Sequence, residues 1–131
     1  MSMAHYTGRC HCGAVQFAAE ADLQAGTMRC NCSICGKMRI WLAFVPPERF
    51  TLVAGEEHLA DYRFGAQRIR HRFCKVCGVK PFGQLVDGSA VALNVVCLDG
   101  VAPEVLAELP IAFLDGAHDR WDTPPAVTAH L

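Results

Sequence analysis

Seven of the eight cysteines in this 131-residue chain lie in three short clusters, and each cluster ends in Cys-Gly. The clusters are Cys10-His11-Cys12-Gly13, Cys30-Asn31-Cys32-Ser33-Ile34-Cys35-Gly36 and Cys74-Lys75-Val76-Cys77-Gly78. Two thiolates one or two residues apart can bind one soft metal ion at about 2.3 Å per bond, in tetrahedral geometry. A glycine after the second cysteine lets the backbone adopt positive φ, so that its amides can point at the sulfurs. The pattern predicts a chain that folds around zinc.

Disulfide bonding is the alternative use of eight cysteines, and the rest of the sequence disfavours it. The N-terminal residues show no apolar signal-peptide core, and no apolar run approaches the roughly 20 residues of a membrane span. These features predict a cytoplasmic protein with no membrane partner, in a compartment that keeps thiols reduced. A disulfide between Cys10 and Cys12 would also close a very tight ring.

The charge balance disfavours a nucleic-acid partner. Twelve basic and thirteen acidic residues give a net charge of −1, and seven thiolates with two Zn²⁺ ions would make the chain still more negative. A protein without a basic surface lacks the main source of affinity for the phosphate backbone of a nucleic acid.

The hydrophobic pattern predicts many short strands. A length of 131 residues and a hydrophobic fraction of 52% indicate a single domain over residues 1–131, with its core at about 8–121. Alternation and turn residues predict strands at 14–20, 40–45, 50–53, 59–64, 68–73, 82–86, 90–98 and 111–114, and one helix at 103–109. The expected fold is all-β, with short, mainly antiparallel sheets clamped by zinc and at most one or two short helices.

Seven thiolates suit a division of four and three. Cys30, Cys32 and Cys35 lie within six residues and can form a three-sulfur site by themselves, which leaves Cys10 and Cys12 to join Cys74 and Cys77. A four-thiolate zinc is closed and structural, whereas three protein ligands leave one position open for a substrate. We therefore expect two zinc ions per chain, one structural and one catalytic.

The spacing leaves two alternative arrangements of the metal ligands open. Cys10 and Cys12 could pair with two of the three central cysteines, which would leave Cys74 and Cys77 elsewhere. All the cysteines could also be structural, with His71 or His11 as an eighth ligand.

The three motifs, taken together and in order, resemble those of the glutathione-dependent formaldehyde-activating enzyme family, which includes centromere protein V-like proteins. The resemblance rests on Gly8-x-Cys10-x-Cys12-Gly13-x-Val15-x-Phe17, on Cys30-x-Cys32-x-x-Cys35-Gly36 and on Phe73-Cys74-x-x-Cys77-Gly78, with similarity extending to residues 94–99. It implies a β-tent fold, with Cys10, Cys12, Cys74 and Cys77 as structural zinc ligands and Cys30, Cys32 and Cys35 as ligands of a catalytic zinc.

The resemblance also implies an activity. The family joins glutathione to formaldehyde as S-hydroxymethylglutathione and is classed with carbon–sulfur lyases, so the implied partner is a small thiol or thiol adduct such as glutathione. A homodimer is compatible with the sequence. The competing functions are a non-catalytic, zinc-stabilised binding module and a redox enzyme similar to methionine sulfoxide reductases, with Cys97 as the nucleophile.

Cationic residues are the candidates for binding a substrate carboxylate. Lys37 and Arg39 follow the central cysteine cluster, and Arg68, Arg70 and Arg72 are predicted to share one strand face. Lys37 is the best placed because it lies two residues after Cys35. We expect Cys97 to lie in the core, Trp41 and Trp121 to be packing residues, and Asp115-Gly116 to form a turn without a chemical role.

Overall fold

The computed structural model describes residues 3–131. The smaller of its two sheets has three antiparallel strands in the order β1 (Ala4–Arg9), β2 (Gln16–Ala21) and β5 (Phe50–Ala54). The larger has seven strands in the order β10 (Ile111–Leu114), β3 (Thr27–Cys30), β4 (Leu42–Val45), β9 (Val91–Asn94), β8 (Phe82–Leu85), β7 (Ile69–Cys74) and β6 (Leu59–Tyr62).

Helices are few and short within the described residues. The two α-helices are α1 (Ser33–Met38) and α2 (Pro103–Ala107). Single 3₁₀ turns are η1 (Leu23–Ala25), η2 (Pro47–Arg49), η3 (Glu56–His58), η4 (Val95–Cys97) and η5 (Gly116–His118). The predicted class, all-β with at most two short helices, is confirmed. No helix in residues 3–131 is long and apolar enough to cross a membrane.

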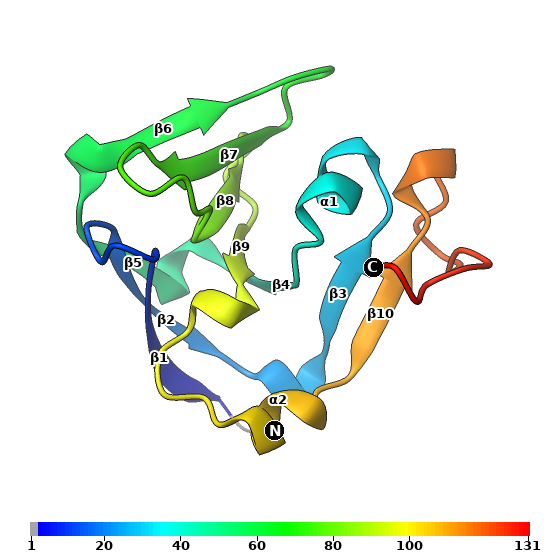
Figure 1. The fold of residues 1–131 in the computed structure, drawn as a ribbon, viewed down its shortest axis with the longest axis horizontal. Coiled ribbons are helices and arrows are strands. Elements are labelled where there is room, and N and C mark those ends of the chain that lie inside the picture. The colour runs from blue at the N-terminus through cyan, green and yellow to red at the C-terminus, as the bar shows by residue number, and fades with distance from the viewer. Residues whose placement is uncertain (1–2) are drawn as a thin grey trace.

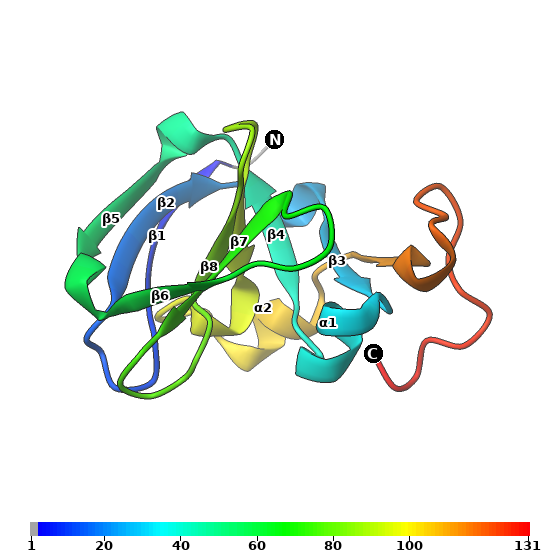
Figure 2. The same ribbon diagram turned by 90° about the horizontal axis from the view of Figure 1, so that it is seen from above.

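The elements of the two sheets form two groups, on different sides of the molecule. Figure 1 shows the smaller sheet and the β6–β8 end of the larger sheet on one side, and α1, β3 and β10 on the other. The view from above in Figure 2 separates the same two groups and places the C-terminus near α1, as Figure 1 does. The larger sheet therefore bends around α1, which carries part of the central cysteine cluster.

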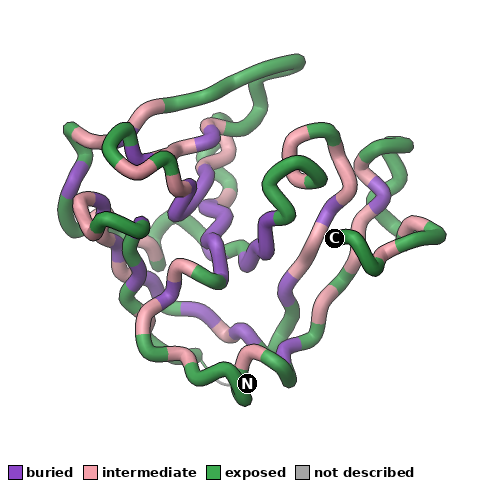
Figure 3. Tube along the Cα trace, viewed as in Figure 1, coloured by how far each residue is buried: buried purple, intermediate pink, exposed green. Residues whose placement is uncertain are grey.

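Aromatic side chains join the two sheets in the core. The Phe17 ring of β2 lies 5.9 Å from the Phe82 ring of β8, in an edge-to-face arrangement, and the Phe50 ring of β5 lies 4.7 Å from Phe82. Phe17 and Phe82 are almost completely buried. The buried residues lie mainly along the strands in the middle of the molecule, whereas none of residues 121–130 is buried (Figure 3). Contacts of this kind fix how the sheets pack against each other.

Most predicted strands are present with shifted ends. Residues 111–114 form a strand as predicted, and Asp87-Gly88 forms the β8–β9 hairpin turn, where the Leu85 amide donates to the Ala90 carbonyl. The strand predicted at 90–98 is too long, because the chain leaves the sheet after Asn94 and forms η4. Hydrophobic pattern alone does not mark this end, since Val95 is apolar and buried although it lies in η4.

Three elements were not predicted, and each has a local cause. β1 is largely polar and exposed, and β3 has only four residues, so neither shows a clear alternation. The single predicted helix at 103–109 corresponds to α2, but the prediction of one helix is wrong because residues 33–38 form α1. The residues that begin α1 belong to a cysteine motif, and such a motif does not distinguish a helical turn from a loop.

A substitution at Gly55, which follows β5, would test how tightly the smaller sheet packs. Its φ is 91°, and a Cβ there would overlap the backbone of Ala14 and lie 2.7 Å from the Cα of Val15. We expect Gly55→Ala to lower the free energy of unfolding by at least about 3 kcal/mol. In the control Gly65→Ala, φ is 57° and no atom lies within 4 Å, so it should cost only about 1–2 kcal/mol. Urea unfolding with zinc and reductant present measures both, and equal losses would contradict the expectation.

Candidate metal centres

Cys10, Cys12, Cys74 and Cys77 bring their sulfurs together from distant parts of the chain. The four Sγ atoms lie within 4.8 Å of one another, with 3.7 Å between Cys10 and Cys12 and 3.6 Å between Cys12 and Cys74. Bonds of about 2.3 Å in a tetrahedron place neighbouring sulfurs about 3.8 Å apart. The spacing therefore fits one four-coordinate zinc ion, and the alternative pairing of Cys10 and Cys12 with central cysteines is not what the fold brings together.

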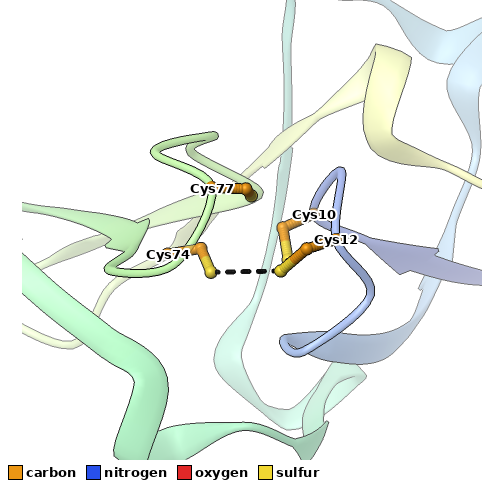
Figure 4. Close-up of side chains that lie close together, drawn as sticks. All are labelled: Cys10, Cys12, Cys74 and Cys77. Atoms are coloured by element: carbon orange, nitrogen blue, oxygen red, sulfur yellow. Dashed lines mark hydrogen bonds between the residues drawn. The ribbon is translucent and has the colours of Figure 1, made fainter.

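This four-cysteine cluster connects the two sheets. Cys10 and Cys12 lie in the turn between β1 and β2, whereas Cys74 ends β7 and Cys77 lies in the turn before β8. Figure 4 shows the two turns facing each other, with the side chains directed into the space between them. A metal bound here would fix one sheet to the other.

Backbone amides point at the sulfurs of both clusters. The Val15 amide donates to Cys10 Sγ at 3.4 Å, the Val76 amide to Cys74 Sγ at 3.3 Å, and the Cys32 amide to Cys30 Sγ at 3.3 Å. Such donors stabilise negative charge on sulfur and so favour the thiolate that a metal requires. Gly13 and Gly78 have φ near 80°, as predicted for a glycine after the second cysteine. Gly36 does not, because it lies inside α1.

Cys30, Cys32 and Cys35 form a second, separate group. Cys30 ends β3, Cys32 is the residue that precedes α1, and Cys35 lies in its first turn. Their sulfurs also lie within 4.8 Å of one another. Since Cys32 and Cys35 are three residues apart at the start of a helix, they project from the same side of it toward Cys30. Three sulfurs can hold a tetrahedral zinc with one position left for another ligand.

The thiols of the central cluster differ in pKa. A hydrogen bond from Cys35 lowers the pKa of Cys30 to about 5, helped by the Cys32 backbone and side chain and by the Gly116 amide. The same hydrogen bond, together with burial, raises the pKa of Cys35. Cys30 is thus a thiolate at neutral pH, which is the form that binds zinc.

The segment after β10 clamps the central cluster through the side chain of Asn31. Asn31 Nδ2 donates to Asp115 Oδ1 at 2.8 Å, and the Ala117 amide donates to Asn31 Oδ1 at 2.9 Å. His118 Nδ1 lies 2.8 Å from the same carboxylate oxygen. Gly116 packs against the sulfur of Cys30, because a Cβ there would lie 2.7 Å from Cys30 Sγ.

This clamp corrects one expectation. Asp115-Gly116 does form a turn, but it also supports the cysteine cluster, and sequence reasoning assigned it no role. The signal that could have found it is weak: a polar Asn between two metal-type cysteines needs a partner for its amide, and the sequence does not say where that partner lies.

No histidine completes either cluster among residues 3–131. His11 is exposed in the first cysteine turn, and His71 Nδ1 instead lies 2.8 Å from Lys80 Nζ. The hypothesis of a histidine as eighth ligand is therefore wrong for this arrangement of side chains.

The predicted arginine face is occupied by an internal partner. The Asp61 carboxylate lies 2.7 Å from Arg70 Nε and 2.6 Å from Arg72 Nε. These ion pairs across β6 and β7 leave Arg70 and Arg72 poorly suited to bind a substrate. Lys37 is exposed on α1 and borders a hollow of about 290 Å³, whose other lining residues are Ser33, Ile34, Tyr62 and Phe64.

Cys97 and the tryptophans differ in their environments. Burial raises the pKa of Cys97 to about 11, so it is a protonated, weakly nucleophilic thiol at neutral pH. Trp41 is buried, as expected, and its Nε1 donates to Thr27 Oγ1 at 2.7 Å. Trp121 is 55% exposed, but one part of its ring packs over Gly116, beside the central cluster.

A comparison with known protein families identifies the family of this chain. The sequence model described as "Glutathione-dependent formaldehyde-activating enzyme" matches residues 5–109. The chain belongs to this family. The match contains all seven clustered cysteines and ends before Asp115, so the part of the clamp contributed by residues 115–118 lies outside it.

One solved structure is similar over most of the chain. A crystal structure of a Rhodobacter sphaeroides protein shares 34% sequence identity and superposes with a TM-score of 0.72. The similarity covers 81% of this chain and 99% of that one. The two-sheet architecture is therefore shared with a relative of known structure.

The two clusters should differ in what they do for stability. Structural zinc contributes roughly 10–16 kcal/mol in finger peptides, which exceeds the stability of most domains. We expect Cys74→Ser to abolish cooperative thermal unfolding, whereas Cys35→Ser keeps it and loses one zinc. Circular dichroism melting and metal analysis check this, and a folded Cys74→Ser protein with two zinc ions would contradict it.

Gly116 allows a more selective disturbance of the central cluster. A methyl group at Gly116 would collide with Cys30 Sγ and the Trp121 ring, whereas one at Gly36, beside Cys35, would meet its nearest atom at 3.6 Å. We expect Gly116→Ala to hold about one zinc per chain and Gly36→Ala to hold as many as the unchanged protein. Equal zinc contents in the two variants would show that the clamp does not position the sulfurs.

Proposed function

We propose that this protein is a zinc-dependent carbon–sulfur lyase that joins a small thiol to an aldehyde and separates them again. The observation that carries this proposal is the inequality of the two clusters: four sulfurs in one, three in the other. A protein that used zinc only as a scaffold would have no need for an incomplete set of ligands. Membership in an enzyme family whose description names glutathione and formaldehyde supports the same function.

Each cluster has a separate proposed role. Cys10, Cys12, Cys74 and Cys77 hold a structural zinc, and Cys30, Cys32 and Cys35 hold the catalytic one. Zinc bound by three cysteines would lower the pKa of a substrate thiol that enters the open position and so supply a thiolate nucleophile. The chain orients this site through the Cys32 amide and the Asn31–Asp115 hydrogen bond.

The reaction conserves atoms and charge without a redox partner. A lone pair on sulfur forms the C–S bond to the aldehyde carbon, and the C=O π electrons move to oxygen, which gains a proton. In the reverse direction the hydroxyl loses that proton, the C=O bond reforms and the C–S bond breaks. With glutathione and formaldehyde the product is S-hydroxymethylglutathione.

The hollow beside α1 is the proposed place for the body of the thiol. Ile34, Tyr62 and Phe64 give it apolar walls, and Lys37 supplies a cation at its edge. Tyr62 and Phe64 stack with ring centroids 5.8 Å apart and are both exposed. An exposed apolar surface next to a candidate site is typical of ligand contact.

Lys37 provides a test of this placement. Because the ammonium group is exposed, its attraction for a substrate carboxylate should contribute no more than about 1 kcal/mol. We expect Lys37→Ala to raise KM for glutathione about three- to fivefold with little change in kcat, and to leave KM for a neutral thiol such as 2-mercaptoethanol unchanged. An equal rise for both thiols would exclude a role in binding the carboxylate.

The activity itself is tested by metal analysis and exchange NMR. We expect two zinc ions per chain, and faster interconversion of glutathione, ¹³C-formaldehyde and their adduct than the uncatalysed rate measured without protein. The Cys35→Ser variant, which keeps the structural cluster, should show only the uncatalysed rate. A protein with both zinc ions and no effect on interconversion would instead be a zinc-stabilised binding module.

A redox function through Cys97 has no support in its surroundings. Its Sγ atom lies 3.9 Å from the Lys80 carbonyl oxygen and is partly buried, and its raised pKa keeps it protonated. The proposal therefore assigns no chemistry to Cys97.

A further inference from the structure

Lys80 is a buried cation that none of the roles above uses. It is only 9% exposed, and it lies between the Cys74–Cys77 turn and β8. A lysine ammonium is seldom buried unless anionic or hydrogen-bonding groups compensate its charge. We therefore expect such compensating groups around the Lys80 ammonium.

The sheet register places this ammonium on the face that carries the central cysteines. A Cβ at Gly83 would lie 3.3 Å from Lys80 Nζ, so the ammonium lies over Gly83. Gly83 is directly opposite Ala92 on β9, and opposite residues in an antiparallel pair project to the same side of the sheet. Ala92 in turn packs in the small cluster that contains Cys35.

The electrostatics of Lys80 agree with this placement. Burial lowers the pKa of Lys80, and negative charge on Cys35 and then on Cys32, which they would carry as thiolate ligands, counteracts this. The groups that face Lys80 are thus these two cysteines, on and just before α1, and the uncharged ring of His71 on β7, which is its hydrogen-bond partner. A zinc ion held by three thiolates would keep a net negative charge on that side, which favours a nearby ammonium.

His71 fixes the ammonium in place. Burial and the positive charge of Lys80 lower the pKa of His71 to about 4, so its ring is neutral at pH 7. A neutral Nδ1 can accept the hydrogen bond that Lys80 Nζ donates at 2.8 Å, with the ring proton on Nε2. The Phe64 ring stacks on His71 at 5.7 Å, and the Asn94 side chain donates to the Lys80 carbonyl at 3.0 Å. Only one of the three ammonium protons is used by an acceptor among the described residues.

We propose that Lys80 is a catalytic residue that hydrogen-bonds the aldehyde oxygen and exchanges a proton with it. This inference rests on the proposed function. As the thiolate forms the C–S bond, the C=O π electrons move to oxygen, and one N–H proton of Lys80 passes to that oxygen, which leaves a neutral amine. The amine regains a proton from solvent; in the reverse reaction it takes the hydroxyl proton as the C–S bond breaks.

Gly83 is part of the same arrangement. A Cβ there would lie 3.3 Å from Lys80 Nζ, so that even a methyl group would press on the end of the Lys80 side chain. The absence of a side chain at Gly83 thus leaves room on this sheet face for the Lys80 ammonium.

The test compares Lys80→Met with Arg49→Met. Methionine keeps the length of the side chain and removes its charge, and the control removes one charge from exposed η2, outside both clusters. With Co²⁺ in place of zinc, addition of glutathione to the unchanged protein should alter the visible absorption of the open site. No alteration, together with no catalysed exchange, would contradict the proposed function itself.

If the unchanged protein shows this change in cobalt absorption, the Lys80→Met variant tests the role of Lys80 separately from the proposed function. We expect Lys80→Met to keep the glutathione-dependent change in cobalt absorption, with a midpoint within about threefold, while the exchange rate with formaldehyde falls about 10²–10³-fold. Arg49→Met should keep both. An exchange rate within threefold of the unchanged protein would overturn the proposal, as would joint loss of the cobalt response and the rate, which would give Lys80 a structural role.

If Lys80→Met does not fold, the double variant Lys80→Met/His71→Phe replaces both members of the pair with apolar groups, which avoids an unpaired buried nitrogen. The same two readouts then apply. Failure of both variants to fold would also overturn the proposal, because the pair would be required for the structure.

Discussion

The cross-sheet cluster of Cys10, Cys12, Cys74 and Cys77 is the contact on which the rest of this structure depends. Two turns that lie more than sixty residues apart in the chain place four sulfurs at the spacing of one tetrahedral ion. The sheets have a shared aromatic core, but the strands are only four to six residues long. Short strands of this kind provide few ladder hydrogen bonds each, so a strong point of attachment between the turns has a large effect on the whole fold.

The central cluster depends on a different kind of support. Cys30, Cys32 and Cys35 come from one short segment, and they need no distant cysteine to approach one another. What comes from far away is the clamp of Asn31 with Asp115 and Ala117, and the close approach of Gly116 to Cys30. If only three side chains hold a metal ion, those three must be held rigidly in place. The hydrogen bonds of Asn31, which lies between Cys30 and Cys32, provide that rigidity.

The bend of the larger sheet brings a third component to this cluster. The β7–β9 face that carries His71, Gly83 and Ala92 lies across from α1 (Figure 1). Lys80 lies on this face and is held by the neutral ring of His71. The buried ammonium group thus lies on the sheet face whose Ala92 packs in one cluster with Cys35, which suits the proposed reaction, since that reaction creates negative charge on oxygen.

The sequence by itself determined which residues could bind metal, because spacing within a cysteine motif is a local property of the backbone. It also determined the all-β class and most strands, since alternation records which face of a strand is buried. It did not determine α1, whose first turn belongs to a metal motif, or the end of β9 at Asn94. Tertiary structure alone decided that Asp115 supports Asn31, that Asp61 pairs with Arg70 and Arg72, and that Lys80 pairs with His71. These are pairings across 9 to 84 residues, and no local pattern encodes them because they follow from strand order and from the bend of the sheet.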